Sequence, residues 1–207
     1  MTLQIEKFTF GRAATNCYFL YDPKTNRGFV IDPGEQPNAL LRRIEGVDLE
    51  AIVLTHAHFD HIAGVDAVRK AKGCPVYLHD AEAEWLTNPE LNGSLRFLDL
   101  GPVASEPAEF ALDEGMELKL LGETFRIMHT PGHSPGSCSL LWNGMVFGGD
   151  VLFRLSVGRT DLRASNHQTL MDSIYDKLFR LPPETVVHPG HGPETTIGYE
   201  IEHNPFV

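Results

Sequence analysis

A dense cluster of histidine and aspartate side chains stands directly after an apolar run in this chain. Residues 51–54 are Ala-Ile-Val-Leu, a short continuous apolar stretch typical of a buried strand. The next seven residues are Thr55-His56-Ala57-His58-Phe59-Asp60-His61. Burying so many ionisable groups without compensation costs several kcal/mol for each group or shifts its pKa. A bound metal ion removes that cost, whereas the alternative, a solvated surface loop, fits poorly beside a buried strand.

The spacing inside the cluster predicts two neighbouring metal positions. Alternate residues of an extended segment point the same way, so His56 and His58 can reach one ion together. Apolar residues at helical spacing follow until Gly73, which can cap a helix, so the chain turns after the histidines. That turn directs Asp60 and His61 toward a second position. Imidazole and carboxylate together suit zinc, iron, manganese or cobalt.

Other metal-competent residues stand in loops that follow strand-like runs. His133 lies in Thr130-Pro131-Gly132-His133, Asp150 follows Gly148-Gly149, and His191 lies in Pro189-Gly190-His191-Gly192. Strand-end loops that each present one such side chain are the expected layout for a site at the rim of sheets.

The remaining pattern predicts two strand-rich halves with helices between them. Gly122 and the pair Asn143-Gly144 mark hairpin turns. Asp80 is expected to cap a helix that runs to Leu86. Ser165 to Gln168 fits a capping box for a helix whose apolar stripe is Leu170, Met171, Ile174, Tyr175 and Leu178. We expect an α+β protein in which two packed sheets are covered on the outside by helices.

Composition limits the classes of function. The 207 residues are 42% hydrophobic and contain no long apolar stretch or signal-like start, so we expect one domain over 1–207, located in the cytoplasm, with no membrane partner. The net charge of −11 and the lack of a basic run argue against a nucleic-acid partner. Cys17, Cys74 and Cys138 are expected to be reduced thiols. The sequence leaves the oligomeric state open.

These motifs resemble the metallo-β-lactamase superfamily, whose pattern is HxHxDH followed by separate His, Asp and His ligands. The resemblance covers essentially the whole chain, includes Val30 to Gly34, and is greatest toward the glyoxalase II-like hydrolases. It implies a four-layer αββα sandwich. It also implies two divalent ions, with zinc preferred and iron or manganese as alternatives. One ion would take His56, His58 and His133, the other Asp60, His61 and His191, and Asp150 would bridge them.

Departures from two other branches support this choice. Class B β-lactamases typically carry cysteine at the place of Asp150, and flavodiiron proteins carry an acidic residue at the place of His58. The resemblance therefore implies a metal-dependent thioesterase that acts on S-lactoylglutathione-like acyl thioesters, or related esters, through a metal-bridging hydroxide. Asp60 would also have a catalytic role by orienting that hydroxide. Glutathione recognition stays open, because the basic C-terminal extension of full-length glyoxalase II has no counterpart before Val207.

Two alternative functions stay open. One is a persulfide dioxygenase with a single iron held by His56, His133 and Asp150. The other is a non-catalytic metal-binding module.

Further residues are expected around the site rather than on the metal. Arg154, Arg159 and Arg163 follow the bridging aspartate and would suit a carboxylate-bearing substrate, although Arg159 could instead pair with Asp161. Asp32, His129 and His188 end strands beside ligand loops and are candidates to support the ligands. The remaining histidines, His79, His167 and His203, are expected to be structural or solvated.

Overall fold

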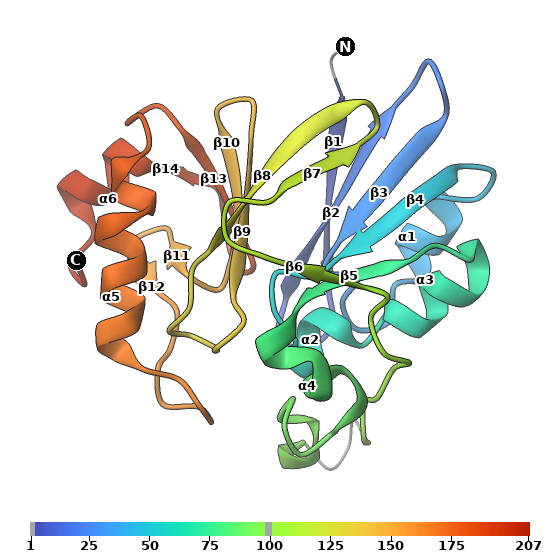
Figure 1. Cartoon of the computed structure of the whole chain (residues 1–207), viewed down its shortest axis with the longest axis horizontal. Helices are drawn as coiled ribbons and strands as arrows, with labels where there is room; N and C mark the ends of the chain where they lie inside the picture. The colour runs from blue at the N-terminus through green and yellow to red at the C-terminus, as the bar shows by residue number, and fades with distance from the viewer. Residues whose placement is uncertain (1–2, 98–100) are drawn as a thin grey trace.

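Two sheets lie face to face, with helices on the outer side of each, as Figure 1 shows. The computed structural model describes residues 3–97 and 101–207. Helices α1 (Asn38–Arg43) and α3 (Val65–Lys72) flank one sheet, and α5 (His167–Asp176) and α6 (Ile197–His203) flank the other. The predicted α+β, four-layer αββα arrangement is confirmed.

The first sheet has the order β1-β2-β3-β4-β5-β6. Its strands are β1 (Gln4–Phe10), β2 (Thr15–Asp22), β3 (Arg27–Ile31), β4 (Asp48–Val53), β5 (Val76–His79) and β6 (Phe110–Leu112). Strands β1 to β3 pair antiparallel, and β3 to β6 pair parallel. Parallel neighbours end at the same edge of a sheet, so β4 delivers the histidine-rich loop to the edge that β3 and β5 also reach.

The second sheet has the order β14-β13-β10-β9-β8-β7. Its strands are β7 (Glu117–Leu120), β8 (Glu123–His129), β9 (Cys138–Trp142), β10 (Met145–Gly149), β13 (Val186–Pro189) and β14 (Thr195–Thr196). Strands β10 and β13 are parallel, so the loops after both open on the same edge. The predicted hairpin turns are confirmed: Leu121 and Gly122 have φ of 56° and 77°, and Asn143 and Gly144 have φ of 48° and 75°.

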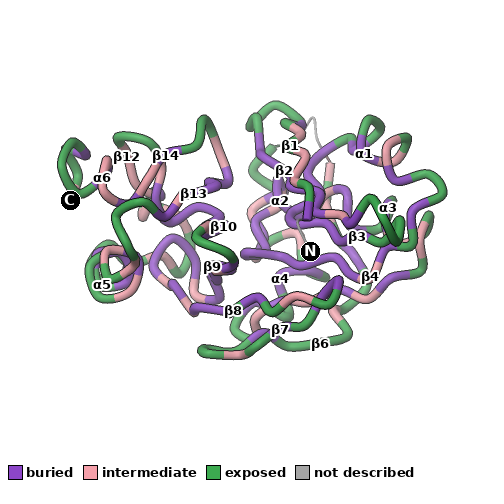
Figure 2. Tube along the Cα trace, turned by 90° about the horizontal axis from the view of Figure 1, so that it is seen from above, coloured by how far each residue is buried: buried purple, intermediate pink, exposed green. Residues whose placement is uncertain are grey.

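Successive residues of a strand point to opposite faces of the sheet, and many on both faces are buried because each sheet is covered on both sides. In β2, Cys17 and Phe19 pack toward the outer helices, whereas Tyr18 and Leu20 pack between the sheets. A further cluster around Leu170 and Ile174 fills the space between the second sheet and its helices. Figure 2 shows buried residues running through the strands and exposed ones in the outer turns. The layered core therefore holds both sheet edges in fixed positions.

Several local predictions needed correction. A 3-10 turn (Asp80–Glu82) and α4 (Ala83–Thr87) begin after His79, whose side chain, rather than that of Asp80, accepts the capping bond from the Ala81 N–H. Helix α5 is capped by Asn166, not by Ser165, because the Asn166 side chain accepts from the Thr169 N–H.

Other elements were not predicted or lie outside the predicted stripe. Tyr175 is exposed rather than part of the buried face of α5. The small hairpin of β11 (Leu152–Phe153) and β12 (Ser156–Val157), strand β14 and helix α6 were not predicted. The 3-10 turn Ser94–Arg96 and strand β6 were not predicted either, and residues 98–100 lie outside the described part.

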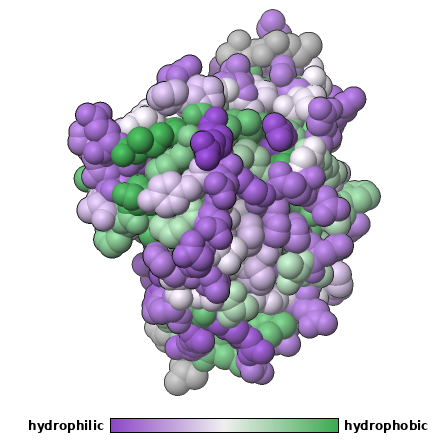
Figure 3. Space-filling model, turned by 60° about the vertical axis from the view of Figure 1, so that its left-hand side comes forward, coloured by the Kyte–Doolittle hydropathy of each residue, from purple (hydrophilic) through white to green (hydrophobic). Residues whose placement is uncertain are grey.

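The outward side of the second helical layer is mixed in polarity. Figure 3 brings the side of α5 and α6 forward and shows hydrophilic side chains interspersed with smaller apolar areas. Within the described residues, no helix is both long enough and apolar enough to cross a membrane. The short helix α2 (Phe59–Ile62) continues the histidine-rich loop, and α4 lies near it.

Candidate metal centre

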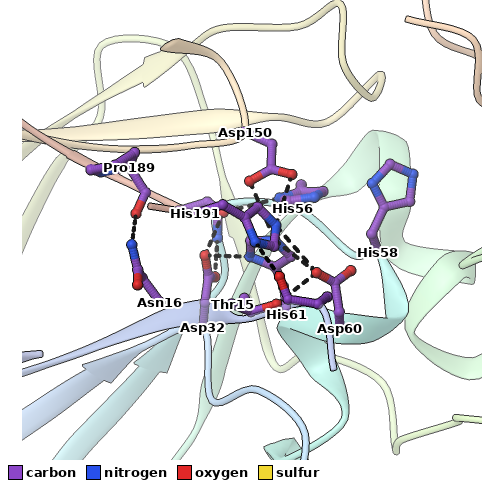
Figure 4. A network of polar contacts seen from close by, with 12 residues as sticks. Thr15, Asn16, Asp32, His56, His58, Asp60, His61, Asp150, Pro189 and His191 are labelled. Carbon is purple, nitrogen blue, oxygen red and sulfur yellow. Dashed lines mark hydrogen bonds and ion pairs between the residues drawn. The ribbon is translucent and has the colours of Figure 1, made fainter. Parts of the chain in front are cut away.

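The loops predicted to carry ligands meet at the edge where the two sheets face each other. Strand β4 ends before His56 and His58, and α2 carries Asp60 and His61 on its first turn. The second sheet supplies the other residues from loops after its strands: His133 after β8, Asp150 after β10 and His191 after β13. Figure 4 shows Asp150 above the histidines and aspartate of the first sheet, with His191 beside them. Every predicted ligand therefore comes from a strand end or from the first turn of a helix.

The first group of donor atoms comprises His56, His58 and His133. One nitrogen from each ring lies within 4.8 Å of the others. His58 Nδ1 and His133 Nε2 are 2.8 Å apart, and all three side chains are nearly or fully buried. Imidazole nitrogens converging on one buried point fit a cation, because two lone pairs at this separation repel unless a proton or a metal lies between them.

The second group comprises Asp60, His61 and His191, whose donor atoms also lie within 4.8 Å of one another. Asp60 Oδ2 is 3.5 Å from His61 Nε2 and 3.3 Å from His191 Nε2. The Thr15 hydroxyl, at the start of β2, donates to the same carboxylate oxygen at 2.7 Å. The second predicted ligand set is thus also brought together, with its carboxylate held from outside.

Asp150 lies between the two groups. Its Oδ1 is 3.4 Å from His61 Nε2, and its Oδ2 is 3.5 Å from His133 Nε2 and 3.3 Å from His191 Nε2. This one carboxylate therefore faces ligands of both groups. Such a position suits a bridging anion that shields two cations from each other.

Hydrogen bonds fix which nitrogen of most rings faces the centre. His61 Nδ1 is 2.9 Å from Asp32 Oδ2, His133 Nδ1 is 2.9 Å from the Arg159 carbonyl, and His191 Nδ1 is 3.0 Å from the Ala13 carbonyl. Because these partners only accept, each Nδ1 carries the proton and each Nε2 offers its lone pair.

His56 follows the same rule through Thr55. The Thr55 hydroxyl donates to Asp32 Oδ2 at 2.6 Å, so it accepts from His56 Nδ1, 3.1 Å away. Asp32 thereby orients two ligand rings, one directly and one through Thr55. The structure supports the expectation that Asp32 assists the ligands.

Buried polar atoms without partners test whether a metal fits this site. Within the described residues, His56 Nε2, His61 Nε2 and Asp150 Oδ1 are buried without a hydrogen-bond partner. Orphaned groups of this kind are costly unless an ion satisfies them. A Cβ on Gly190 would lie 2.2 Å from Asp150 Oδ1, so glycine is needed for the backbone to approach the carboxylate. The donor set therefore fits divalent metal ions.

A further possible grouping joins Asp32 with His56 and His61. Asp32 already accepts bonds from Thr55 N at 2.8 Å, from the Thr55 hydroxyl and from His61 Nδ1. Its oxygens are occupied on the outer side of the rings. We therefore regard Asp32 as a support for the ligands and not as a ligand.

The charges of this centre divide the histidines into two kinds. Burial, and then the neighbouring His133, lower the pKa of His58 to about 3, and burial also lowers the pKa of His56 well below its ordinary value. Burial would lower the pKa of His191 as well, but Asp150 and Asp60 outweigh it and raise the pKa to about 10. Without a metal, the second group holds protons where a cation would otherwise balance its carboxylates.

A cavity of about 410 Å³ opens over the centre. Its floor includes His58, Asp60, His133 and His191. Its walls include Phe59 and Phe97, whose rings lie 4.7 Å apart. A concave, partly apolar site above convergent polar groups is the usual form of a small-molecule site.

The arginines predicted to bind substrate divide between two places. Arg159 and Arg163 line the cavity, as does Arg96, which the sequence interpretation missed. Arg159 also forms the alternative pair with Asp161, with bonds of 2.7 Å. Arg154 lies elsewhere, over the Tyr199 ring at 5.2 Å, because the β11–β12 hairpin turns at this residue and carries it away. Its predicted place beside the substrate needs correction.

The remaining histidines lie outside the centre. His129 Nε2 is 2.9 Å from the Pro135 carbonyl, so it supports the loop of His133, and it stacks on His79. His188 packs on Phe147 and lies 3.2 Å from Glu194, away from the ligands. His167 is exposed. His129 therefore supports a ligand loop, whereas the proposed supporting role of His188 is not reflected in its contacts.

The comparisons with known proteins agree with this geometry. The chain is 41% identical to the probable metallo-hydrolase YqgX of Bacillus subtilis, covering 95% of this chain and 94% of that protein. It is 35% identical to the hydroxyacylglutathione hydrolase GloC of Haemophilus influenzae, covering 93% and 92%.

Solved structures show the same fold. The BLEG-1 B3 metallo-beta-lactamase has a TM-score of 0.93 at 45% identity over 98% of this chain and 99% of its own. TTHA1623 in a di-iron-bound form has a TM-score of 0.85 at 40% identity over 98% and 100%. ETHE1 from Myxococcus xanthus has a TM-score of 0.81 at 29% identity over 98% and 83%.

The model of the metallo-beta-lactamase superfamily matches residues 10–191, a range that contains every one of the seven predicted ligands. The sandwich of two sheets and the donor groups at their common edge agree with this match. The chain therefore belongs to the metallo-beta-lactamase superfamily of metallo-hydrolases.

Proposed function

We propose that this metallo-hydrolase is a thioesterase for small acyl thioesters that carry a negative charge, of the S-lactoylglutathione kind. The observation that carries the proposal is one cavity that is lined both by members of the two donor groups and by arginines. The GloC relative, named a hydroxyacylglutathione hydrolase, supports the same substrate class.

Divalent ions bound by His56, His58 and His133 and by Asp60, His61 and His191 would lower the pKa of a coordinated water toward about 7 and polarise an acyl carbonyl. Asp60 is held by Thr15 and faces the cavity, so its carboxylate can accept a hydrogen bond from the attacking water. A thiolate leaving group, whose conjugate acid has a pKa near 8.5, departs without a strong general acid.

Charge explains how an anion would reach this site. The chain carries a net charge of −11, yet Arg96, Arg159 and Arg163 all line the cavity. Arg159 pairs with exposed Asp161 and Arg163 with exposed Glu90, so an anionic substrate would compete with these carboxylates for the guanidinium groups. Local positive charge at a cleft raises the local concentration of anionic substrates and speeds their association. The phenylalanines Phe59 and Phe97 would cover the apolar part of the acyl or thiol group.

An oxidoreductase function is the second candidate. The similarity to ETHE1 leaves open a persulfide dioxygenase with one iron, held by His56, His133 and Asp150. The completeness of the Asp60, His61 and His191 group favours two ions and hence hydrolysis.

The test uses protein loaded in turn with zinc, iron and manganese. Hydrolysis of S-lactoylglutathione, oxygen uptake with glutathione persulfide and hydrolysis of a chromogenic β-lactam are measured in parallel, the last because of the BLEG-1 similarity. We expect thioester hydrolysis without oxygen uptake. Oxygen uptake without hydrolysis would establish the dioxygenase, and β-lactam cleavage alone would establish a lactamase. A metal-loaded protein that shows none of the three activities would be a non-catalytic module.

The charge part of the proposal has its own test. Arg163→Gln should raise KM for an anionic thioester about two- to fivefold, the size of an exposed ion pair, and leave kcat and the KM for a neutral thioester unchanged. Arg180→Gln, an exposed arginine paired with Asp176 away from the cavity, is the matched control. Equal effects on both substrates would contradict the assigned role.

A further inference from the structure

The ligands of each donor group come from two different sheets. His56 and His58 follow the first sheet, and His133 belongs to the second. Ligands must be held within fractions of an ångström to bind a metal tightly, so some contact must fix the loops of the two sheets relative to each other. The structure contains such contacts, and they involve residues that are not ligands.

Glu82 joins the loops of the first donor group. It follows β5 in the first sheet and is fully buried. Its Oε2 accepts from the Ala57 N–H at 2.5 Å, and its Oε1 accepts from the Gly136 N–H at 2.7 Å. Ala57 lies between His56 and His58, and Gly136 follows His133 by three residues. One carboxylate thus holds the backbone of both loops that supply this group.

The fit around Glu82 is close. A Cβ on Gly136 would lie 2.9 Å from Glu82 Cγ, a contact that the buried side chain can relieve only by moving. The Cys138 N–H also donates to the Thr55 carbonyl at 2.8 Å beside this carboxylate. Hydrogen bonds to an ionised acceptor are about twice as strong as neutral ones. Glu82 is therefore suited to set the distance between the two loops.

The second donor group has a counterpart in Asn16. This residue lies in β2 of the first sheet and is buried. Its Nδ2 donates to the Pro189 carbonyl at 3.0 Å and to the Gly192 carbonyl at 2.9 Å, on either side of His191. Figure 4 shows Asn16 below Pro189, outside the ring of ligands. The neighbouring Thr15 holds Asp60 of the same group.

We propose that Glu82 and Asn16 are positioning residues, each for one of the two ions. Glu82 sets the site of His56, His58 and His133, and Asn16 sets the site of Asp60, His61 and His191. Neither residue belongs to a donor group. The inference rests on the two-ion centre and is independent of the substrate that the centre cleaves.

The first experiment compares Glu82→Gln with Glu200→Gln. Glu200 is an equally buried carboxylate that accepts from the Leu155 N–H at 2.8 Å and from Asn204 Nδ2 at 2.8 Å, away from the ligand loops. Metal affinity is measured with Co²⁺ by absorption and by competition with a chelator, and apoprotein melting is recorded beside it. We expect Glu82→Gln to weaken one of the two ions about 10- to 100-fold, while Glu200→Gln lowers the melting temperature and binds both ions normally.

Second substitutions identify which ion is weakened. Adding His133→Ala to Glu82→Gln should affect only the ion that is already weakened, whereas adding His191→Ala should weaken the other ion as well. Asn16→Ala should show the reverse pattern. Gly136→Ala, which displaces Glu82 from the other side, should reproduce Glu82→Gln and replaces it if that variant fails to fold.

Two results would overturn the inference. One is normal binding of both ions by Glu82→Gln or Gly136→Ala. The other is that Glu82→Gln and Glu200→Gln each weaken the binding of both ions to the same extent, which would show a general loss of stability. Because the readout is metal binding, a protein without thioesterase activity that still shows the site-specific pattern would refute the proposed function and leave this inference standing.

Discussion

Replacing Asp32 by asparagine removes charge without removing volume and tests how the ligand rings are oriented. Asp32 has φ of 51°, a left-handed conformation that asparagine also tolerates, so the backbone should remain in place. An amide oxygen can still accept from the Thr55 N–H. Its NH₂ group then faces the Thr55 hydroxyl and His61 Nδ1, which now need a partner that accepts.

The expected magnitude follows from these contacts. His61 can accept from the new amide only by moving its proton to Nε2, the atom that faces Asp60 and Asp150. A proton there competes with the metal. Loss of a partner that orients a metal-bound histidine typically costs about 10- to 100-fold in affinity, or about 1.4 to 2.7 kcal/mol. This agrees with the roughly 1.5 to 3 kcal/mol of a hydrogen bond to a charged group.

The assay is competition of the metal-loaded protein with a chromogenic chelator, which resolves the two dissociation constants. We expect the dissociation constant of the ion held by Asp60, His61 and His191 to rise. Asp22→Asn is the matched control, since Asp22 is also buried and accepts from the Lys24 N–H and the Thr25 hydroxyl at 2.9 Å, in a turn outside the centre. If Asp32→Asn bound both ions as tightly as Asp22→Asn, the orienting role of Asp32 would be refuted.

Two other perturbations address the centre itself. Asp150→Ala should lose the second ion and lower thioesterase activity by more than about 100-fold, because the carboxylate faces both donor groups. The exposed control His167→Ala should change neither metal stoichiometry nor rate. Two bound ions with near-normal turnover in Asp150→Ala would show that the ligand assignment is wrong. The raised pKa of His191, about 10, stabilises the metal-free protein fully below the ordinary histidine pKa near 6.5, and this stabilisation is lost as pH rises toward 10. Metal binding at neutral pH must displace that proton, so the metal affinity should rise by up to about tenfold per pH unit between pH 6.5 and 8.5. Calorimetry in buffers of different ionisation enthalpy should count at least one released proton. A metal affinity that does not change with pH would contradict the protonated state of His191.

The sequence was enough to predict that the candidate ligand residues converge because its signals are local. His56 to His61 stand in one loop after an apolar strand, and His133, Asp150 and His191 each follow a strand in a turn rich in glycine or proline. Strand ends of a layered sheet meet at one edge, so local signals were enough to predict that these residues converge. The hairpin turns at Gly122 and Gly144 are likewise determined by neighbouring residues.

The residues that the sequence did not reveal act over long separations. Glu82 contacts Gly136, 54 positions away, and Asn16 contacts Pro189, 173 positions away. No spacing rule marks a carboxylate or amide that will bond to the backbone of a distant loop. The prediction for Arg154 was wrong for the opposite reason. Arg154 is close to Asp150 in sequence, but the hairpin formed by β11 and β12 carries it away from the cavity.

The division of ligands between sheets has a consequence for stability. Both donor groups combine residues of the first sheet with residues of the second, so an ion bound in either group would join the two sheets. An ion that binds only the folded chain adds about 4.1 kcal/mol when present at 1,000 times its dissociation constant. The inter-sheet core that includes Phe29, Phe125 and Phe147 contains none of the donor residues, and it packs the two sheets together. The core therefore determines the fold, whereas Glu82 and Asn16 determine the finer alignment of the sheet edges that metal binding requires.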